Sequence, residues 1–84
     1  MQAELRIEIP AANPLDAATD FFRNHLDRAQ KALEGNADSL VIMLPSATSD
    51  HDDWRRAVAR DLARQYAPKR VNLLGGGDFM AVEA

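Results

Sequence analysis

The sequence predicts a single α/β domain in which three strands and two helices alternate in the order β-α-β-α-β. Residues 4–9 alternate apolar with charged side chains, and residues 39–44 are apolar after Ser39 and do not alternate. The segment after each of these strands repeats its apolar residues every three or four positions, as a helix does. Crossover helices of this length join parallel strands, so we expect a parallel sheet. A chain of 84 residues has room for one core, and residues 1–84 are therefore expected to form one α/β domain.

The first expected strand, residues 4–9, reads ELRIEI and is typical of a strand with one wet face. Pro10 ends it. Asn13 and Pro14 then begin a helix, because the Asn side chain accepts from free N–H groups and Pro already has a helical φ. Gly35 and Asn36 tolerate the left-handed conformation that ends many helices. The apolar stripe predicted to face the core consists of Leu15, Ala18, Phe22, Leu26, Ala29 and Leu33.

Residues 39–44, SLVIML, lack alternation and are predicted to form the central strand, covered on both faces. Ser49 or Asp50 is expected to cap a second helix that runs to about Tyr66. Its predicted stripe is Trp54, Ala57 or Val58, Leu62 and Tyr66.

A third strand, residues 70–74, follows the helix stop at Ala67-Pro68 and leads into Gly75-Gly76-Gly77. The tail, residues 79–84, is too short for a helix of its own, and a short strand and a covering arm both remain open.

We expect the strand order 1-2-3. A central strand of a parallel sheet is covered on both faces, and the first strand has one charged face. That order places both crossover helices on one face. Apolar residues of the central strand then face away from the helices with nothing to cover them, and soluble monomers rarely expose such a patch. The sequence therefore predicts a homodimer or a protein partner, joined sheet face to sheet face or edge to edge.

The composition narrows the partners and the compartment. The net charge is −3, with acidic and basic residues interspersed, so we expect no nucleic acid partner. No run of about 18 apolar residues is present, so we expect no membrane span. The chain has no cysteine for a disulfide or a thiolate metal site, and a cytoplasmic location is the default expectation.

Residues 57–77, AVARDLARQYAPKRVNLLGGG, resemble the helix, A-P turn and R-V-N strand that follow the active site of short-chain dehydrogenase/reductases. Residues 22–46, FRNHLDRAQKALEGNADSLVIMLPS, are similar to that family's preceding helix and to the strand that ends at its catalytic serine. The resemblance implies the C-terminal half of a Rossmann domain, a half-Rossmann β-α-β-α-β unit.

The family's chemistry is not carried by the matching positions. The resemblance places Thr48 and Asp52 where the family has Tyr and Lys, and Pro45 or Ser46 at the position of the serine. An Asp in place of the Lys inverts the charge that activates the phenol. The glycine-rich cofactor turn between first strand and helix has no counterpart. We therefore expect no catalytic residues, no cofactor and no hydride chemistry.

Ligands of open α/β sheets bind at the carboxyl ends of the strands. The ligand-binding candidates at that edge are Asn13, Ser46, Thr48, Ser49, Gly75, Gly76 and Gly77. Asp50, His51, Asp52 and Asp53 crowd together in sequence, but consecutive helical residues point about 100° apart, so we expect a helix start and no metal site. Ser46 or Ser49 with His51 and an Asp has the residue types of a hydrolase triad, but no nucleophile elbow is present.

Two further groups of side chains have simpler interpretations. His25 lies near the edge of the first helix's stripe and is expected to be a packing residue. Arg56, Arg60 and Arg64 form an i, i+4 ladder, expected to be a solvated face paired with acids such as Asp52 and Asp61, with a docking stripe for an acidic partner as the alternative.

Two functions from different classes remain. The first is a non-catalytic interaction module that works by self-association or by docking to a larger partner. The alternative is a small ligand- or nucleotide-binding domain, or a short-chain dehydrogenase-like enzyme, that uses the loops at the carboxyl ends of the strands.

Overall fold

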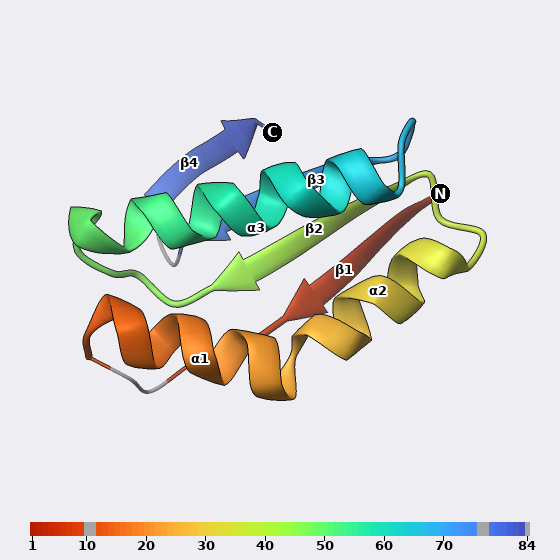
Figure 1. The fold of residues 1–84 in the computed structure, drawn as a ribbon. Coiled ribbons are helices and arrows are strands. Elements are labelled where there is room, and N and C mark those ends of the chain that lie inside the picture. Colours follow the sequence, from red (N-terminus) through yellow and green to blue (C-terminus); the bar gives the residue numbers. More distant parts are fainter. Residues whose placement is uncertain (10–11, 76–77, 84) are drawn as a thin grey trace.

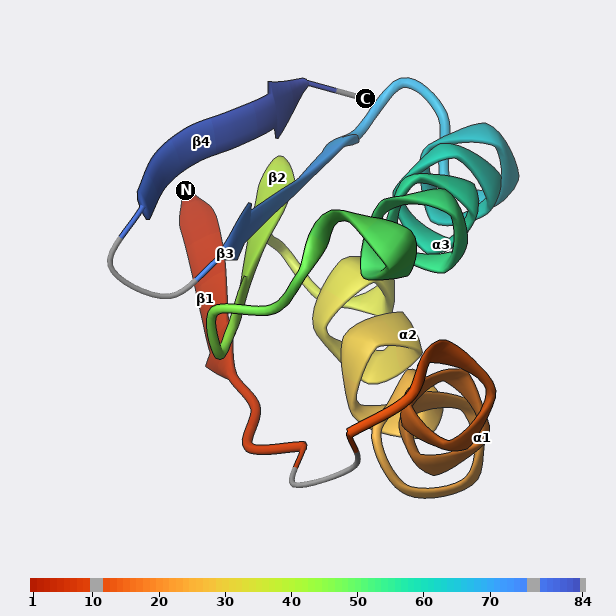
Figure 2. The ribbon, with the colours of Figure 1, turned by 90° about the vertical axis from the view of Figure 1, so that its left-hand side faces the viewer.

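The computed structural model describes residues 1–9 and 12–75, and the backbone of residues 78–83. Figure 1 shows a twisted sheet with its strands in the order β1-β2-β3-β4, and Figure 2 shows that the helices all lie on one face of it. The elements are β1 (Gln2–Arg6), α1 (Pro14–Asn24), α2 (Leu26–Glu34), β2 (Ser39–Leu44), the 3-10 turn η1 (Ser49–His51), α3 (Asp52–Gln65), β3 (Arg70–Gly75) and β4 (Asp78–Glu83). The predicted fold class and the parallel order 1-2-3 are confirmed.

The first strand begins and ends earlier than the alternation predicted. β1 pairs with β2 from Gln2 opposite Ser39 to Arg6 opposite Met43. The Ile7 N–H still donates to the Met43 carbonyl (2.9 Å), but β2 ends at Leu44, so the residues that follow Ile7 have no partner strand. The alternation of buried and exposed side chains nevertheless continues to Ile9.

The single first helix that we expected is two helices, and the predicted core stripe is wrong in its first half. The helix is interrupted at His25, where φ is −127°, and resumes at Leu26. Leu15 and Phe22 are 81% and 52% exposed, whereas Phe21 is fully buried. Adjacent phenylalanines offer two overlapping stripes, and Phe21 is the one whose ring packs against Trp54 of α3, with ring centroids 5.8 Å apart.

The end of α2 is stabilised by a lysine and not by a left-handed residue. Gly35 has φ −82°, and none of the described non-glycine residues, Asn36 included, has a positive φ. The Lys69 ammonium instead donates to the carbonyls of Leu33 and Gly35, the latter at 2.9 Å. A cation at a helix C-terminus also complements the helix dipole.

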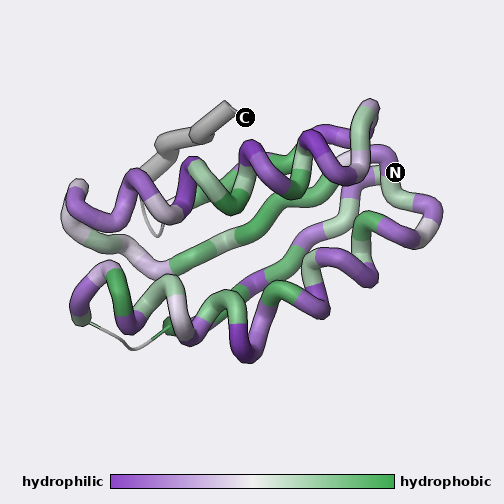
Figure 3. The backbone as a smooth tube through the Cα atoms, in the orientation of Figure 1, coloured by the Kyte–Doolittle hydropathy of each residue, from purple (hydrophilic) through white to green (hydrophobic). Residues whose placement is uncertain are grey.

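The core lies between the sheet and the helices, and β2 is its centre. Side chains of β2 and β3 that face the helices are buried: Leu40, Ile42, Leu44, Val71 and Leu73. From α3, Val58, Ala59 and Leu62 pack onto them, so the alternative with Val58 in the stripe is the correct one. Figure 3 shows the apolar character of β2 along its length.

The tail is a strand, which removes the covering arm as an alternative. β4 pairs antiparallel with β3, with Asn72 opposite Glu83 and Leu74 opposite Ala81. It therefore widens the sheet without crossing its open face. On that face the central residues Val41 and Met43 are half-buried, so β2 is covered completely on one face only.

The open face carries more charge than the central strand alone suggested. Gln2, Glu4 and Arg6 of β1 are exposed there beside the half-buried Met43. The Arg6 guanidinium approaches the Met43 sulfur at 3.9 Å.

None of the helices in the described part of the chain is long and apolar enough to cross a bilayer.

Candidate functional site

Of the predicted candidates that the structure describes, Asn13 lies after β1, the three hydroxyl residues 46, 48 and 49 lie after β2, and Gly75 is the last residue of β3. Asn13 is the N-cap of α1, as its sequence context predicted. Its Oδ1 accepts from the Asp16 N–H (2.9 Å), and its Nδ2 donates to the Asp16 carboxylate (2.8 Å). Both polar groups of the amide are therefore used in starting the helix.

The segment between β2 and α3 is exposed at Ser46, Thr48 and Ser49. The Thr48 hydroxyl donates to Asp50 Oδ1, and this hydrogen bond holds the pKa of Asp50 below its ordinary value. The predicted capping by Ser49 or Asp50 is wrong, because the chain first makes a 3-10 turn in which the His51 N–H donates to the Thr48 carbonyl. The turn satisfies this N–H through the backbone, so no side-chain cap forms.

His51 is buried at 4% exposure, and both of its ring nitrogens have partners. The Trp54 indole N–H donates to His51 Nδ1 (3.1 Å), and an indole nitrogen can only donate. Nε2 therefore carries the proton and donates to the Ala12 carbonyl at 3.3 Å. This neutral histidine ties the segment after β1 to the start of α3 and has no nitrogen free to act as a base.

Gly75 ends β3 directly beside α3. A Cβ at this position would lie 3.5 Å from Arg55 Nη1, in ordinary contact. The other two candidates of the glycine run, Gly76 and Gly77, lie outside the described residues.

Arg55 also lies at this edge of the sheet, although the sequence analysis did not name it as a candidate site residue. Its Nη2 donates to the Pro45 carbonyl (3.0 Å), and its guanidinium lies 5.6 Å from the Trp54 ring centroid. Its Nε is buried and finds no acceptor among the described residues. Burial lowers the pKa of Arg55, while the nearby Asp52 carboxylate opposes that shift. In sequence only its neighbour Arg56 fits a helical ladder, so nothing there distinguished Arg55 from the solvated arginines.

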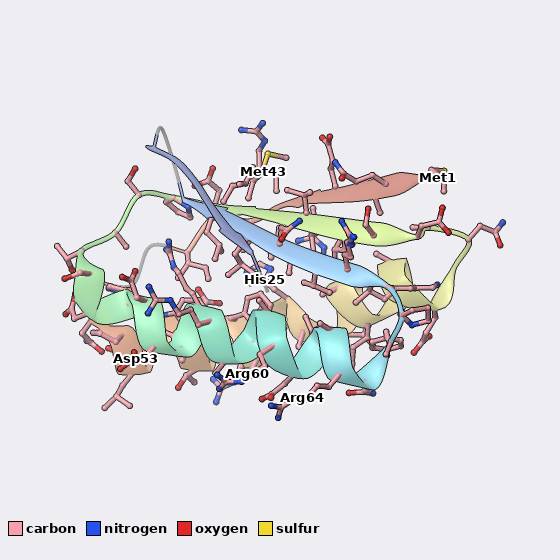
Figure 4. The ribbon with its side chains drawn as sticks, turned by 90° about the horizontal axis from the view of Figure 1, so that it is seen from above. Met1, His25, Met43, Asp53, Arg60 and Arg64 are labelled. Atoms are coloured by element: carbon pink, nitrogen blue, oxygen red, sulfur yellow. The ribbon has the colours of Figure 1, made fainter. Side chains whose placement is uncertain are left out.

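The remaining sequence candidates do not assemble into a site. Within residues 1–9, 12–75 and 78–83, no three His, Asp or Glu side chains are placed to hold a metal ion, the group at 50–53 included. Asp53, Arg60 and Arg64 lie on the side of α3 away from the sheet (Figure 4). The predicted ion pairs of the ladder with Asp52 and Asp61 are wrong for the described part of the chain, where the arginines instead extend into solvent.

His25 is a packing residue at the junction of α1 and α2. Its ring centroid lies 6.3 Å from that of Phe21, and its Nε2 lies 3.8 Å from Asp20 Oδ1. The expected role is confirmed, although its place is a helix break and not a helix interior.

Three parallel strands with their crossover helices on one face define half of a Rossmann-type sheet. The family model described as SDR-like, short chain dehydrogenase-like protein, matches residues 5–84. The chain therefore belongs to the short-chain dehydrogenase-like family. No curated protein and no solved structure matches it.

Proposed function

We propose that this chain is a non-catalytic Rossmann-like interaction module, formed by residues 1–84, that acts by associating with itself. The observation that supports its non-catalytic part is the hydrogen bonding at the edge of the sheet where the parallel strands end. There the side chains of Asn13, Thr48 and His51 form hydrogen bonds to other groups of the same chain. An enzyme would need such groups directed at a substrate.

The family's catalytic pair supports the same proposal. Thr48, at the position of the family's Tyr, hydrogen-bonds to Asp50, and Asp52, at the position of its Lys, is the first residue of α3. A carboxylate there opposes the ionisation of a neighbouring hydroxyl. Purified protein should therefore give no turnover of alcohols or ketones with either nicotinamide cofactor, and turnover that Thr48→Val abolishes would contradict the proposal.

One observation favours the alternative, a ligand-binding domain. Arg55 places a half-buried cation beside Gly75 and the end of β2, where open sheets bind anionic groups. A thermal-shift screen with nicotinamide and adenine nucleotides separates the two functions, because a ligand that binds only the folded chain raises its Tm. The interaction module predicts no shift. Nucleotide binding would be established if a nucleotide raised the Tm of the wild-type chain and of the Arg56→Ala variant by several degrees but did not raise that of Arg55→Ala.

A further inference from the structure

β1 forms one edge of the sheet, and in the described part of the chain it pairs with β2 only. The Ile7 N–H donates to the Met43 carbonyl, and successive residues of a strand direct their N–H and C=O groups to opposite sides. Leu5, like Ile7, therefore turns its backbone groups toward β2. Gln2, Glu4 and Arg6 turn theirs outward, which leaves a row of donors and acceptors available to another strand.

We propose that a second copy of this chain pairs with β1 along this edge, antiparallel, with the twofold axis at Leu5. The proposal rests on the self-association proposed above and names its surface. The two four-stranded sheets would then form one continuous sheet with the helices of both copies on the same face.

The charges of β1 are self-complementary in this register. Glu4 and Arg6 are both exposed and lie two residues apart, so their side chains share the open face of the sheet. Antiparallel pairing about Leu5 places Glu4 opposite the partner's Arg6, and Arg6 opposite the partner's Glu4. Opposite charges directly across a strand pair stabilise it, and like charges destabilise it.

Backbone geometry favours the same register. Glu4 and Arg6 are the residues whose N–H and C=O groups point outward, so each Glu4–Arg6 pair exchanges two hydrogen bonds. Leu5, which is half-buried on the helix side, meets the partner's Leu5 as the pair without hydrogen bonds. A shift of the axis to Glu4 would oppose two glutamates, and a shift to Arg6 would oppose two arginines. The charges thus specify one register.

Charge reversal tests the proposal. Sedimentation equilibrium of the full chain at micromolar concentration and low salt gives the dissociation constant of the dimer, and circular dichroism verifies that each variant is folded. Glu4→Arg and Arg6→Glu each replace two attractive pairs by two repulsive ones, so each should raise the dissociation constant about tenfold or more. An equimolar mixture of the two variants should form a heterodimer, because every cross-pair is then Glu with Arg. The double variant should recover the homodimer.

The outcomes separate this proposal from the proposed function. The control Leu74→Lys adds a charge to the open face two strands away from the β1 edge, and it should leave the dimer intact. A wild-type dimer that Leu74→Lys splits and the Glu4 and Arg6 variants do not would place the interface on the open face, which overturns the β1 edge and leaves self-association standing. A monomeric wild-type chain would overturn both.

Discussion

At the scale of single residues, Asn13, Thr48 and His51 near the carboxyl ends of the strands form hydrogen bonds within the chain. His51 shows the consequence most directly. A buried imidazole needs a partner for each nitrogen, and it finds them in the indole of Trp54 and the carbonyl of Ala12. The sequence offered His51 as a possible member of a triad, because residue types alone do not show which groups are already satisfied.

Trp54→Phe tests this hydrogen bond. The substitution retains an aromatic ring next to Phe21 but removes the one donor to His51 Nδ1 among the described residues, so this buried acceptor loses its hydrogen bond. We expect the free energy of unfolding to fall by about 1–3 kcal/mol. Urea denaturation followed by circular dichroism measures it. Ser46→Ala, at an exposed position of the nearby loop, is the control and should change the value by less than about 0.5 kcal/mol. An equally small effect of Trp54→Phe would contradict the assigned tautomer.

The pKa of Asp50 reports on Thr48 in the same way. The Thr48 hydroxyl, the main cause, holds this pKa below its ordinary value of 3.8. A lowered pKa in the folded chain means that ionised Asp50 stabilises the fold above the unfolded pKa, and that this stabilisation is lost as the pH falls through the folded pKa.

Thr48→Val should therefore raise the pKa of Asp50 toward 3.8, as measured by an NMR titration of its carboxyl carbon. Thr48→Ser keeps a hydroxyl in the same place and should keep the pKa low. If Thr48→Val leaves the titration unchanged, the hydroxyl is not the cause of the shift.

At the scale of elements, the sequence predicted those features for which its pattern allowed one structure. Where the pattern allowed two structures, the prediction failed. Asn13 before Pro14 has one use, as a helix cap, and the structure confirms it. The apolar run at 39–44 likewise gave β2 at its observed bounds. The stripe of α1 was ambiguous because Phe21 and Phe22 are both apolar, and the choice depends on Trp54, which is more than thirty residues away in the chain.

The two phenylalanines provide a matched test of the observed helix face. Phe21→Ala empties a fully buried position between α1 and α3 and should reduce the free energy of unfolding by about 3–5 kcal/mol. Phe22→Ala removes a side chain that is 52% exposed and should cost far less, about 1 kcal/mol or below. Both values come from urea denaturation. The reverse ranking would restore the stripe that periodicity predicted.

At the scale of the whole molecule, topology decided which faces remain open. The strand order was predictable from the charged face of β1, and crossovers between parallel strands are right-handed as a rule. Together they require every helix to lie on one side of the sheet, as Figure 2 shows. The candidate site was predicted less well. Within the described residues the candidates lie at the ends of the strands. The hydrogen bonds of Asn13 and Thr48 join residues two or three positions apart. The contact of His51 with Ala12 and the position of Arg55 beside Pro45 and Gly75 depend instead on the tertiary fold, which the sequence pattern does not show.

Sedimentation of the wild-type chain at micromolar concentration shows whether the chain associates with itself. The mass of one chain is 9.3 kDa, and we expect a species of twice that mass that dissociates on dilution. The free β1 edge, with its outward backbone groups and its alternating Glu4 and Arg6, is the reason for this expectation. A single species of 9.3 kDa throughout the micromolar range would contradict it.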